Sequence, residues 1–288
     1  MKEIWTHNYA NVNGIRMHYV AQGEGPLVVL LHGFPEFWYS WRHQIPFLAK
    51  KYRVVAPDLR GYNETDKPRS GYDVNTLAED IVCLIRHLGA DKAIVMAHDW
   101  GGGVAYHLAY RNPEVLDKLV IMNAPHPVHL MKTLRSSGAQ RRKSWYMFFF
   151  QLPFLPEVYL KAGKHFVLKQ ILARTTVRKE AFSREDIEKY KEAWDKPGAL
   201  GKGVNYYRMA FRKGAGLWRF YQGKQIQAKT LIVWGEKDAF LGRELTEGLE
   251  RYFTAGLDIR YIPNCGHWVQ QEAPDEVNRY LGEFLGMN

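Results

Sequence analysis

Val95-Met-Ala-His-Asp-Trp-Gly-Gly-Gly103 is the stretch that decides the fold of this 288-residue chain. A continuous apolar run at 93–98, typical of a buried strand, enters three glycines, and residues 102–111 then show the apolar periodicity of a helix. Asp99 therefore stands on a tight strand-to-helix turn between small residues. This is the pattern of a nucleophile elbow, which projects one side chain above a helix N-terminus. The alternative is that Asp99 only caps the helix.

The same alternation of strand and helix continues on both sides of this turn. Strands are predicted at 5–12, 15–21, 26–32, 52–57, 93–98, 119–123, 230–235 and 258–262, and helices at 39–48, 76–88, 102–111 and 274–285. Asn13-Gly14 predicts a type I′ hairpin turn, and Thr76-Leu-Ala-Glu79 predicts a capping box. The alternation predicts an α/β fold with a mostly parallel sheet, flanked by helices, that binds ligands beyond the carboxyl ends of its strands.

One helical segment interrupts this pattern. Residues 127–227 hold 21 Lys+Arg against 7 Asp+Glu, whereas the rest of the chain holds 19 against 23, so the net charge of +10 comes from this segment. It is rich in aromatic residues, and Ser183-Arg-Glu-Asp186 predicts a capped helix within it. Because strands resume afterwards, we expect a core domain of residues 1–126 and 228–288 and a helical cap of residues 127–227.

Composition excludes several classes of protein. With 46% hydrophobic and 24% charged residues the chain is an ordinary globular protein, and two cysteines cannot form a disulfide framework. No apolar run is long enough to span a bilayer, and the first dozen residues do not resemble a secretory signal. We therefore expect a cytoplasmic protein without stable membrane insertion. Residues 145–160 are apolar enough to suggest membrane contact, but Pro153 and Pro156 favour a cap helix and turn.

A carboxylate at the elbow limits the chemistry. The helix N-terminus favours the ionised form of Asp99. A serine that attacked saturated carbon would leave an ether, whereas Asp99 would leave an alkyl ester whose carbonyl water can attack. The residue therefore points to displacement at sp³ carbon, either epoxide opening or loss of halide, followed by ester hydrolysis.

Ester hydrolysis requires a base with an orienting partner. His267 follows the last predicted strand in Asn264-Cys-Gly-His-Trp268, and Asp238 follows the preceding strand in Trp234-Gly-Glu-Lys-Asp238. The order nucleophile, acid, histidine is typical of hydrolase triads on this architecture. His267 would deprotonate water and Asp238 would hold its tautomer, with Glu236 as the alternative acid.

An oxyanion site is predicted at the strand that ends in His32-Gly-Phe-Pro-Glu36. The backbone N–H of Phe34 and that of Trp100, directly after the nucleophile, would face the ester oxygen as it becomes an oxyanion. The alternative is a simple turn with an X-Pro bond.

His32-Gly-Phe-Pro-Glu36, His98-Asp-Trp-Gly-Gly102 and Gly266-His267, separated by a helical insertion, resemble the epoxide hydrolases of the α/β-hydrolase fold. The resemblance covers about residues 5–285 and implies that fold, its cap and an Asp-His-Asp triad. It also implies two cap tyrosines that bind the epoxide oxygen and protonate it. The segment that begins Ser144-Trp-Tyr146 assigns the first role to Tyr146, and Asn205-Tyr-Tyr-Arg208 assigns the second to Tyr207 in preference to Tyr206.

Two other classes share parts of this pattern. Many haloalkane dehalogenases carry a halide-binding asparagine where this chain has Phe34, and fluoroacetate dehalogenases carry arginine where it has Trp100. A haloalkane or haloacid dehalogenase is therefore the alternative enzyme, and a ligand-binding receptor of the same fold is the alternative without turnover.

The expected substrate is an apolar or aromatic epoxide. It would bind in a pocket lined by the aromatic candidates Phe34, Trp38, Trp100, Phe148 and Trp268. The reaction requires water but no cofactor and no metal. His126-Pro-Val-His129 suggests a metal pair, but the proline breaks the helical spacing and favours a hinge between core and cap. Since the cap's inward residues are read as aromatic, its basic residues are expected to face solvent, and no nucleic-acid partner is predicted.

Overall fold

The computed structural model describes residues 4–287 and contains one eight-stranded sheet in the order β1-β2-β4-β3-β5-β6-β7-β8. β1 and β2 run antiparallel to their neighbours, and β3 to β8 pair in parallel. The strands are β1 (Thr6–Val12), β2 (Ile15–Gln22), β3 (Leu27–Leu31), β4 (Arg53–Pro57), β5 (Ala93–His98), β6 (Leu116–Met122), β7 (Lys229–Gly235) and β8 (Leu257–Ile262). The predicted mostly parallel sheet is confirmed.

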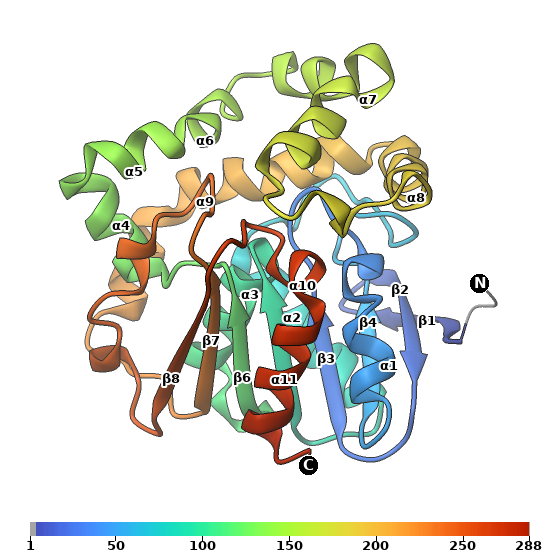
Figure 1. Cartoon of the computed structure of the whole chain (residues 1–288), viewed down its shortest axis with the longest axis vertical. Helices are drawn as coiled ribbons and strands as arrows, with labels where there is room; N and C mark the ends of the chain where they lie inside the picture. The colour runs from blue at the N-terminus through green and yellow to red at the C-terminus, as the bar shows by residue number, and fades with distance from the viewer. Residues whose placement is uncertain (1–3, 288) are drawn as a thin grey trace.

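The continuous apolar runs mark the centre of this sheet. Every residue of β3 and of β5 is buried, since helices cover both faces. The edge strand β8 is only partly buried. On one face lie α1 (Gln44–Leu48), α10 (Val269–Glu272) and α11 (Pro274–Leu285), and on the other α2 (Val74–His87) and α3 (Trp100–Arg111) (Figure 1).

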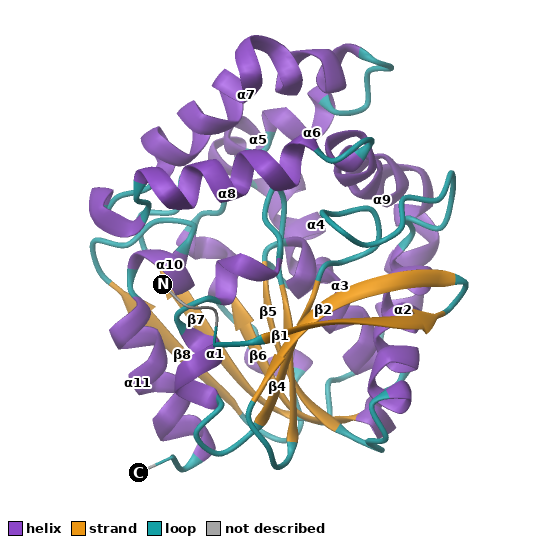
Figure 2. Ribbon diagram, turned by 90° about the vertical axis from the view of Figure 1, so that its right-hand side faces the viewer, coloured by secondary structure: helices purple, strands orange, loops and turns teal. Residues whose placement is uncertain are grey.

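The helices between β6 and β7 form a separate layer. They are α4 (Pro127–Ser136), α5 (Gly138–Lys143), α6 (Trp145–Phe149), α7 (Leu155–Thr175), α8 (Arg184–Asp195) and α9 (Ala199–Tyr221), and we call them the inserted helices. Figure 2 shows this layer above the sheet, on the side of the elbow. The ring of Trp100, the first residue after the elbow, packs 4.9 Å from that of Tyr207 on α9. The inserted helices therefore cover the edge of the sheet where ligands are expected.

Two local predictions are confirmed. Asn13 and Gly14 have φ angles of 44° and 73° and join Val12 to Ile15 in a two-residue hairpin. Ser183 caps α8 in a reciprocal capping box with Asp186.

Two others are wrong at their boundaries. α2 begins before the predicted box, because the Asp73 side chain accepts the backbone N–H and the hydroxyl of Thr76. The predicted helix at 39–48 is a 3₁₀ turn, Trp38–Trp41, followed by the short α1. Pro46 explains this break, since it has no N–H to bond the carbonyl of Arg42 in a continuous helix. Within residues 4–287 no helix is long and apolar enough to cross a bilayer.

Candidate active site

Asp99 lies on a strained turn between β5 and α3. Its φ and ψ angles are 48° and −118°, a conformation that costs roughly 1–3 kcal/mol for a residue with a side chain. The following glycines are required by close packing. A Cβ on Gly101 would lie 2.3 Å from the carbonyl oxygen of Leu31, and one on Gly102 would lie 2.2 Å from the Cβ of Ala124. The predicted elbow geometry is present, and no side-chain cap hydrogen bond from Asp99 to α3 is formed.

The loop after β3 approaches this carboxylate directly. The backbone N–H of Phe34 donates to Asp99 Oδ1 at 2.8 Å. Gly33 makes the approach possible, because a Cβ there would lie 2.4 Å from that of Asp99. Trp100, whose N–H is the second predicted oxyanion donor, is the first residue of α3.

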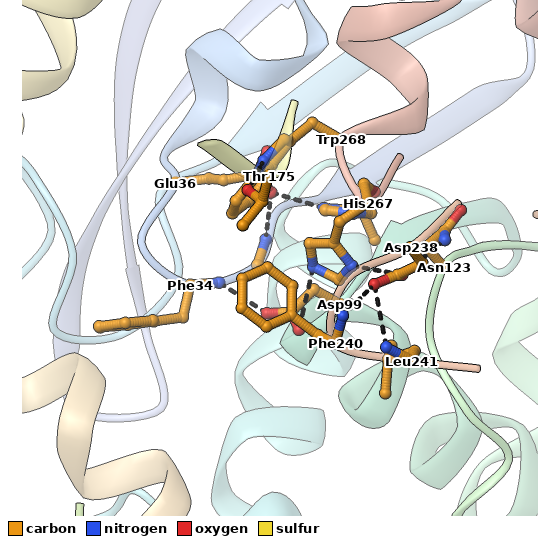
Figure 3. A network of polar contacts seen from close by, with 12 residues as sticks. Phe34, Glu36, Asp99, Asn123, Thr175, Asp238, Phe240, Leu241, His267 and Trp268 are labelled. Carbon is orange, nitrogen blue, oxygen red and sulfur yellow. Dashed lines mark hydrogen bonds and ion pairs between the residues drawn. The ribbon is translucent and has the colours of Figure 1, made fainter. Parts of the chain in front are cut away.

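His267 joins the two predicted carboxylates (Figure 3). Its Nδ1 lies 2.7 Å from Asp238 Oδ2, and its Nε2 lies 3.6 Å from Asp99 Oδ2. The other oxygen of Asp238 accepts the backbone N–H groups of Phe240 and Leu241 at 2.7 and 2.9 Å. The structure thus brings together three residues from three separate strand ends.

Asn123 belongs to this cluster, although it is not among the residues predicted from the sequence. It directly follows β6, and its amide donates to Asp238 Oδ2 at 2.7 Å and accepts the N–H of Gly235 at 2.8 Å. A polar residue at the end of a buried strand is the signal that identifies it. Glu236, the alternative acid, instead pairs with Arg243 at the surface.

The charges of the cluster support one another. Burial alone would lower the pKa of His267, but the charge and hydrogen bond of Asp238, together with Asp99, raise it to about 10. Burial would raise the pKa of Asp99, yet the hydrogen bond and charge of His267 hold it below its usual value. The pKa of Asp238 is also lowered, against burial, by the charge of His267. At neutral pH the site therefore holds two carboxylates and one imidazolium.

A second buried acid–histidine pair adjoins the first, since the ring centroids of His98 and His267 lie 4.8 Å apart, and it too is absent from the predicted site. His98 Nδ1 lies 2.7 Å from Glu36 Oε2, and its Nε2 donates to the backbone carbonyl of His267 at 2.8 Å. Glu36 Oε1 accepts the amides of Gln270 and Gln271. This pair links the loop after β3 to the loop that carries His267.

Two tyrosines from the inserted helices face the elbow. The rings of Tyr146 on α6 and Tyr207 on α9 lie 5.8 Å apart, and that of Tyr207 packs against Trp100. Tyr206 points elsewhere, since its buried hydroxyl donates to the backbone carbonyl of Arg60 at 2.8 Å. Burial, with the charge of Asp99, raises the pKa of both Tyr146 and Tyr207, so each keeps its proton.

The predicted pocket lining divides into two groups. Three candidates lie beside the cluster: the ring centroids of Phe34 and Trp100 lie 5.6 and 4.9 Å from that of Tyr207, and the ring centroid of Trp268 lies 4.8 Å from that of His267. The structure corrects the other two candidates. Phe148 is 54% exposed, because it lies two residues from the inward Tyr146, on the opposite side of α6.

The second correction concerns Trp38. It packs against Trp5 and His7 at the β1 side of the sheet instead of against the triad.

The two histidines of the possible metal pair have separate partners. His126 Nε2 bonds the hydroxyl of Tyr110 at 2.7 Å, and His129 Nε2 bonds the carbonyl of Glu244 at 3.1 Å. Among residues 4–287 there is no group of three or more side chains of the metal-ligating types His, Cys, Asp and Glu placed to hold an ion. His126 directly precedes α4, at the junction of sheet and inserted helices.

The strained elbow, the backbone N–H beside it and the acid–histidine pair are the features of a hydrolase of the α/β fold, here with a carboxylate at the elbow. A sequence model described as alpha/beta hydrolase fold matches residues 26–274. The chain is 43% identical over 286 residues to the AB hydrolase superfamily protein YfhM of Bacillus subtilis, covering 96% of both proteins. It is 39% identical to Epoxide hydrolase 4 of Homo sapiens, covering 97% of this chain and 79% of that protein.

A solved structure agrees with these relatives. The crystal structure of a Bacillus megaterium epoxide hydrolase in complex with an inhibitor superposes with a TM-score of 0.91 at 33% identity, covering 97% of this chain and 100% of the other. The chain belongs to the epoxide hydrolases of the α/β-hydrolase fold.

Proposed function

We propose that this protein converts apolar or aromatic epoxides to vicinal diols through a covalent ester on Asp99. The observation that carries the proposal is the meeting of two protonated tyrosines, Tyr146 and Tyr207, with the Asp99–His267–Asp238 cluster. An alkoxide is a poor leaving group unless an acid protonates it, whereas a halide leaves without one. The paired tyrosines therefore favour epoxide opening over dehalogenation.

In the first step an oxygen of Asp99 attacks one epoxide carbon. The C–O bond to the epoxide oxygen breaks, and a tyrosine hydroxyl gives its proton to the developing alkoxide. The products are an alkyl ester on Asp99, a hydroxyl on the neighbouring carbon and a tyrosinate. Because both tyrosines are uncharged before the reaction, they bind the epoxide oxygen as hydrogen-bond donors.

Ester formation then changes the state of His267. Esterified Asp99 no longer carries the negative charge that helps to raise the pKa of this imidazole. His267 therefore releases its proton more readily, and that proton restores the tyrosine hydroxyl. The same charge that pairs with His267 in the free enzyme is thus removed at the point where a base is required.

Neutral His267 next accepts a proton from water, which attacks the ester carbonyl. Asp238 stabilises the imidazolium that forms. The backbone N–H of Phe34, which meets Asp99 Oδ1 in the free protein, and the N–H of Trp100 stabilise the oxyanion. Collapse of this intermediate breaks the ester C–O bond, and the departing alkoxide takes the proton of the hydroxyl that water added, which releases the diol and leaves Asp99 a carboxylate.

We further propose that residues 1–126 and 228–288 act as the catalytic core and residues 127–227 as a cap. The substrate would lie between them, beside the aromatic rings of Phe34, Trp100 and Trp268. The free cysteines Cys83 and Cys265 fit a reducing compartment, the cytoplasm.

Single turnover in ¹⁸O-labelled water tests the covalent step. The diol formed first should carry unlabelled oxygen from Asp99, and the label should appear in the peptide that contains it. Label that enters the diol directly would refute the ester. His267→Gln should accumulate alkylated protein, visible by intact mass.

The assignment of the acid is tested with a matched pair of variants. Tyr207→Phe should lower epoxide turnover roughly 10²-fold, the usual range for loss of a general acid, whereas Tyr206→Phe should retain most of it. Equal losses would contradict the assignment. Parallel incubation with styrene oxide, 1-chlorobutane and fluoroacetate, with diol and halide measured, separates the hydrolase from a dehalogenase and from a receptor.

A further inference from the structure

The outer side of the inserted helices exposes a group of large apolar side chains. Tyr146 and Phe150 of the α6 segment point inward, so Trp145 and Phe148 face outward, 59% and 54% exposed. The turn into α7 and its first residues continue this surface, with Phe154 and Val158 81% and 65% exposed. The apolar ridge comprises Trp145, Phe148, Leu152, Phe154, Leu155, Val158, Tyr159 and Phe211.

The apolar ridge is supported by ring contacts between three helices. Phe148 on α6 packs 5.3 Å from Phe211 on α9. Phe149 lies 6.0 Å from Trp145 and 5.5 Å from Tyr159 on α7. In Figure 1 α5, α6 and α7 follow one another along the edge of the molecule farthest from the C-terminus. Monomeric soluble proteins rarely expose a large contiguous apolar patch unless it binds something.

The conformation of Phe154 is not explained by packing inside the protein. It precedes α7 with a φ of 61°, a region that bulky residues rarely adopt. Among the side chains that the structure describes, its ring is the most exposed large apolar one. The turn thus holds an aromatic ring outward at some cost in backbone energy, with little burial in return.

Basic residues flank the apolar ridge along the chain. Residues 127–179 contain eleven Lys+Arg and a single carboxylate, Glu157. Glu157 is neutralised by Arg208, whose two terminal nitrogens lie 2.5 and 3.1 Å from its oxygens. Arg142 on α5 and Lys161 and Lys164 on α7 are exposed, and none of them forms an ion pair within residues 4–287. We call Arg142, Lys161 and Lys164 the basic border; in the sequence they precede and follow the part of the ridge on α6 and the start of α7.

We propose that this face docks on an anionic lipid bilayer, with the apolar ridge in the headgroup–acyl boundary and the basic border on lipid phosphates. A peripheral surface of this kind combines apolar burial with attraction to anionic lipid. It requires no spanning helix. The proposal is independent of the function proposed above.

Charge argues against a second copy of the chain as the occupant. Two copies that met through this face would bring together two segments with a balance of +14 each, counted as 21 minus 7. Like charges placed across an interface oppose association. A nucleic acid would meet the charge but not the aliphatic side chains Leu152, Leu155 and Val158, which offer no aromatic face for base stacking.

Flotation of the full chain with lipid vesicles tests the proposal. We expect at least about tenfold more protein on vesicles with about 30% phosphatidylglycerol than on pure phosphatidylcholine, since each basic residue near such a surface contributes about a factor of five. Binding should fall severalfold in about 0.5 M NaCl, where screening is strong. Equal, salt-independent binding to neutral vesicles, or no binding to either, would overturn the proposal.

Variants separate the two halves of the surface. Leu152→Ser/Phe154→Ser/Val158→Ser and Arg142→Glu/Lys161→Glu should each lower anionic-vesicle binding at least about tenfold. A matched charge reversal on the core, Arg86→Glu/Lys92→Glu, should leave it within about twofold.

Folding is followed by circular dichroism and thermal unfolding, so the test does not depend on activity. All substituted side chains are exposed, and we expect the melting temperature to change by less than about 2 °C. A self-association that the triple serine variant abolishes, without vesicle binding by the parent protein, would identify an interface between copies and refute the proposal. Binding of a labelled single-stranded oligonucleotide in preference to vesicles would refute it as well.

Discussion

Glu272→Gln should weaken the joint between the inserted helices and the loop that carries His267. Glu272 ends α10 and is only 4% exposed. Its Oε2 accepts three backbone N–H groups, those of Val177 at 2.7 Å and of Arg178 and Gly266 at 3.1 Å, and its Oε1 accepts that of Trp268 at 3.3 Å. One carboxylate therefore binds the end of the α7 segment to the histidine loop.

The size of the effect follows from these four contacts. A hydrogen bond to a charged group contributes about 1.5–3 kcal/mol to stability, and one to a neutral group about 0.5–1.5 kcal/mol. When the carboxylate becomes a neutral amide, each of the three hydrogen bonds that its oxygen accepts therefore weakens by about 1 kcal/mol. The new NH₂ group then faces the Trp268 N–H, which loses its acceptor and costs about 1–3 kcal/mol more. We expect a total of about 4–6 kcal/mol. At about 2.1 cal/mol/K per residue, the melting temperature should fall by roughly 7–10 °C.

Differential scanning calorimetry measures this shift, and Glu276 provides the matched control. Glu276 lies one turn further along the chain and pairs with Arg178, with 36% of its side chain exposed. Glu276→Gln should therefore lower the melting temperature by less than about 2 °C, since partly exposed ion pairs contribute little. If Glu272→Gln shifts unfolding no more than the control does, the reasoning about the carboxylate joint is wrong.

Three further changes have defined outcomes. Gly102→Ala should lower stability by at least about 2 kcal/mol in denaturant unfolding, because the new Cβ meets that of Ala124 at 2.2 Å, and an unchanged midpoint would contradict the packing. Tyr206→Phe should cost about 1 kcal/mol in the same assay, since the Arg60 carbonyl loses its donor. The pKa of His267 is raised from 6.5 to about 10, so the stabilisation from its protonation is complete below pH 6.5 and is lost as the pH rises towards 10. The difference in melting temperature between the parent protein and His267→Gln should therefore narrow from pH 6 to pH 10, and a constant gap would contradict this linkage.

The sequence was sufficient where the determinants are local. A buried apolar run that enters small residues leaves the backbone one tight path, so the elbow at Asp99 is readable from nine consecutive letters. His267 and Asp238 follow the same logic, because the carboxyl ends of parallel strands meet at one edge of the sheet. The hairpin at Asn13-Gly14 and the cap at Ser183 are equally local.

Local signals were insufficient where two competed. Thr76 and Asp73 both have side chains that cap helices, and only the folded loop shows that Asp73 accepts the N–H of Thr76. The apolar periodicity at 39–48 predicted one continuous helix. Pro46 has no N–H for such a helix, and the segment is divided into a 3₁₀ turn and a short helix.

The sequence by itself determined the order of the strands and helices along the chain, the elbow and the residues that follow each strand, since strand, helix and turn preferences act over a few neighbours. Only the tertiary structure decided which side of α6 faces the site, and so placed Tyr146 inward and Phe148 in the apolar ridge. It alone joined Asn123 to Asp238 and Glu272 to the end of α7, contacts across 115 and about 95 residues. Such contacts depend on how whole elements pack, because a side chain's partner is set by the phase and position of its helix or strand and not by its own neighbours.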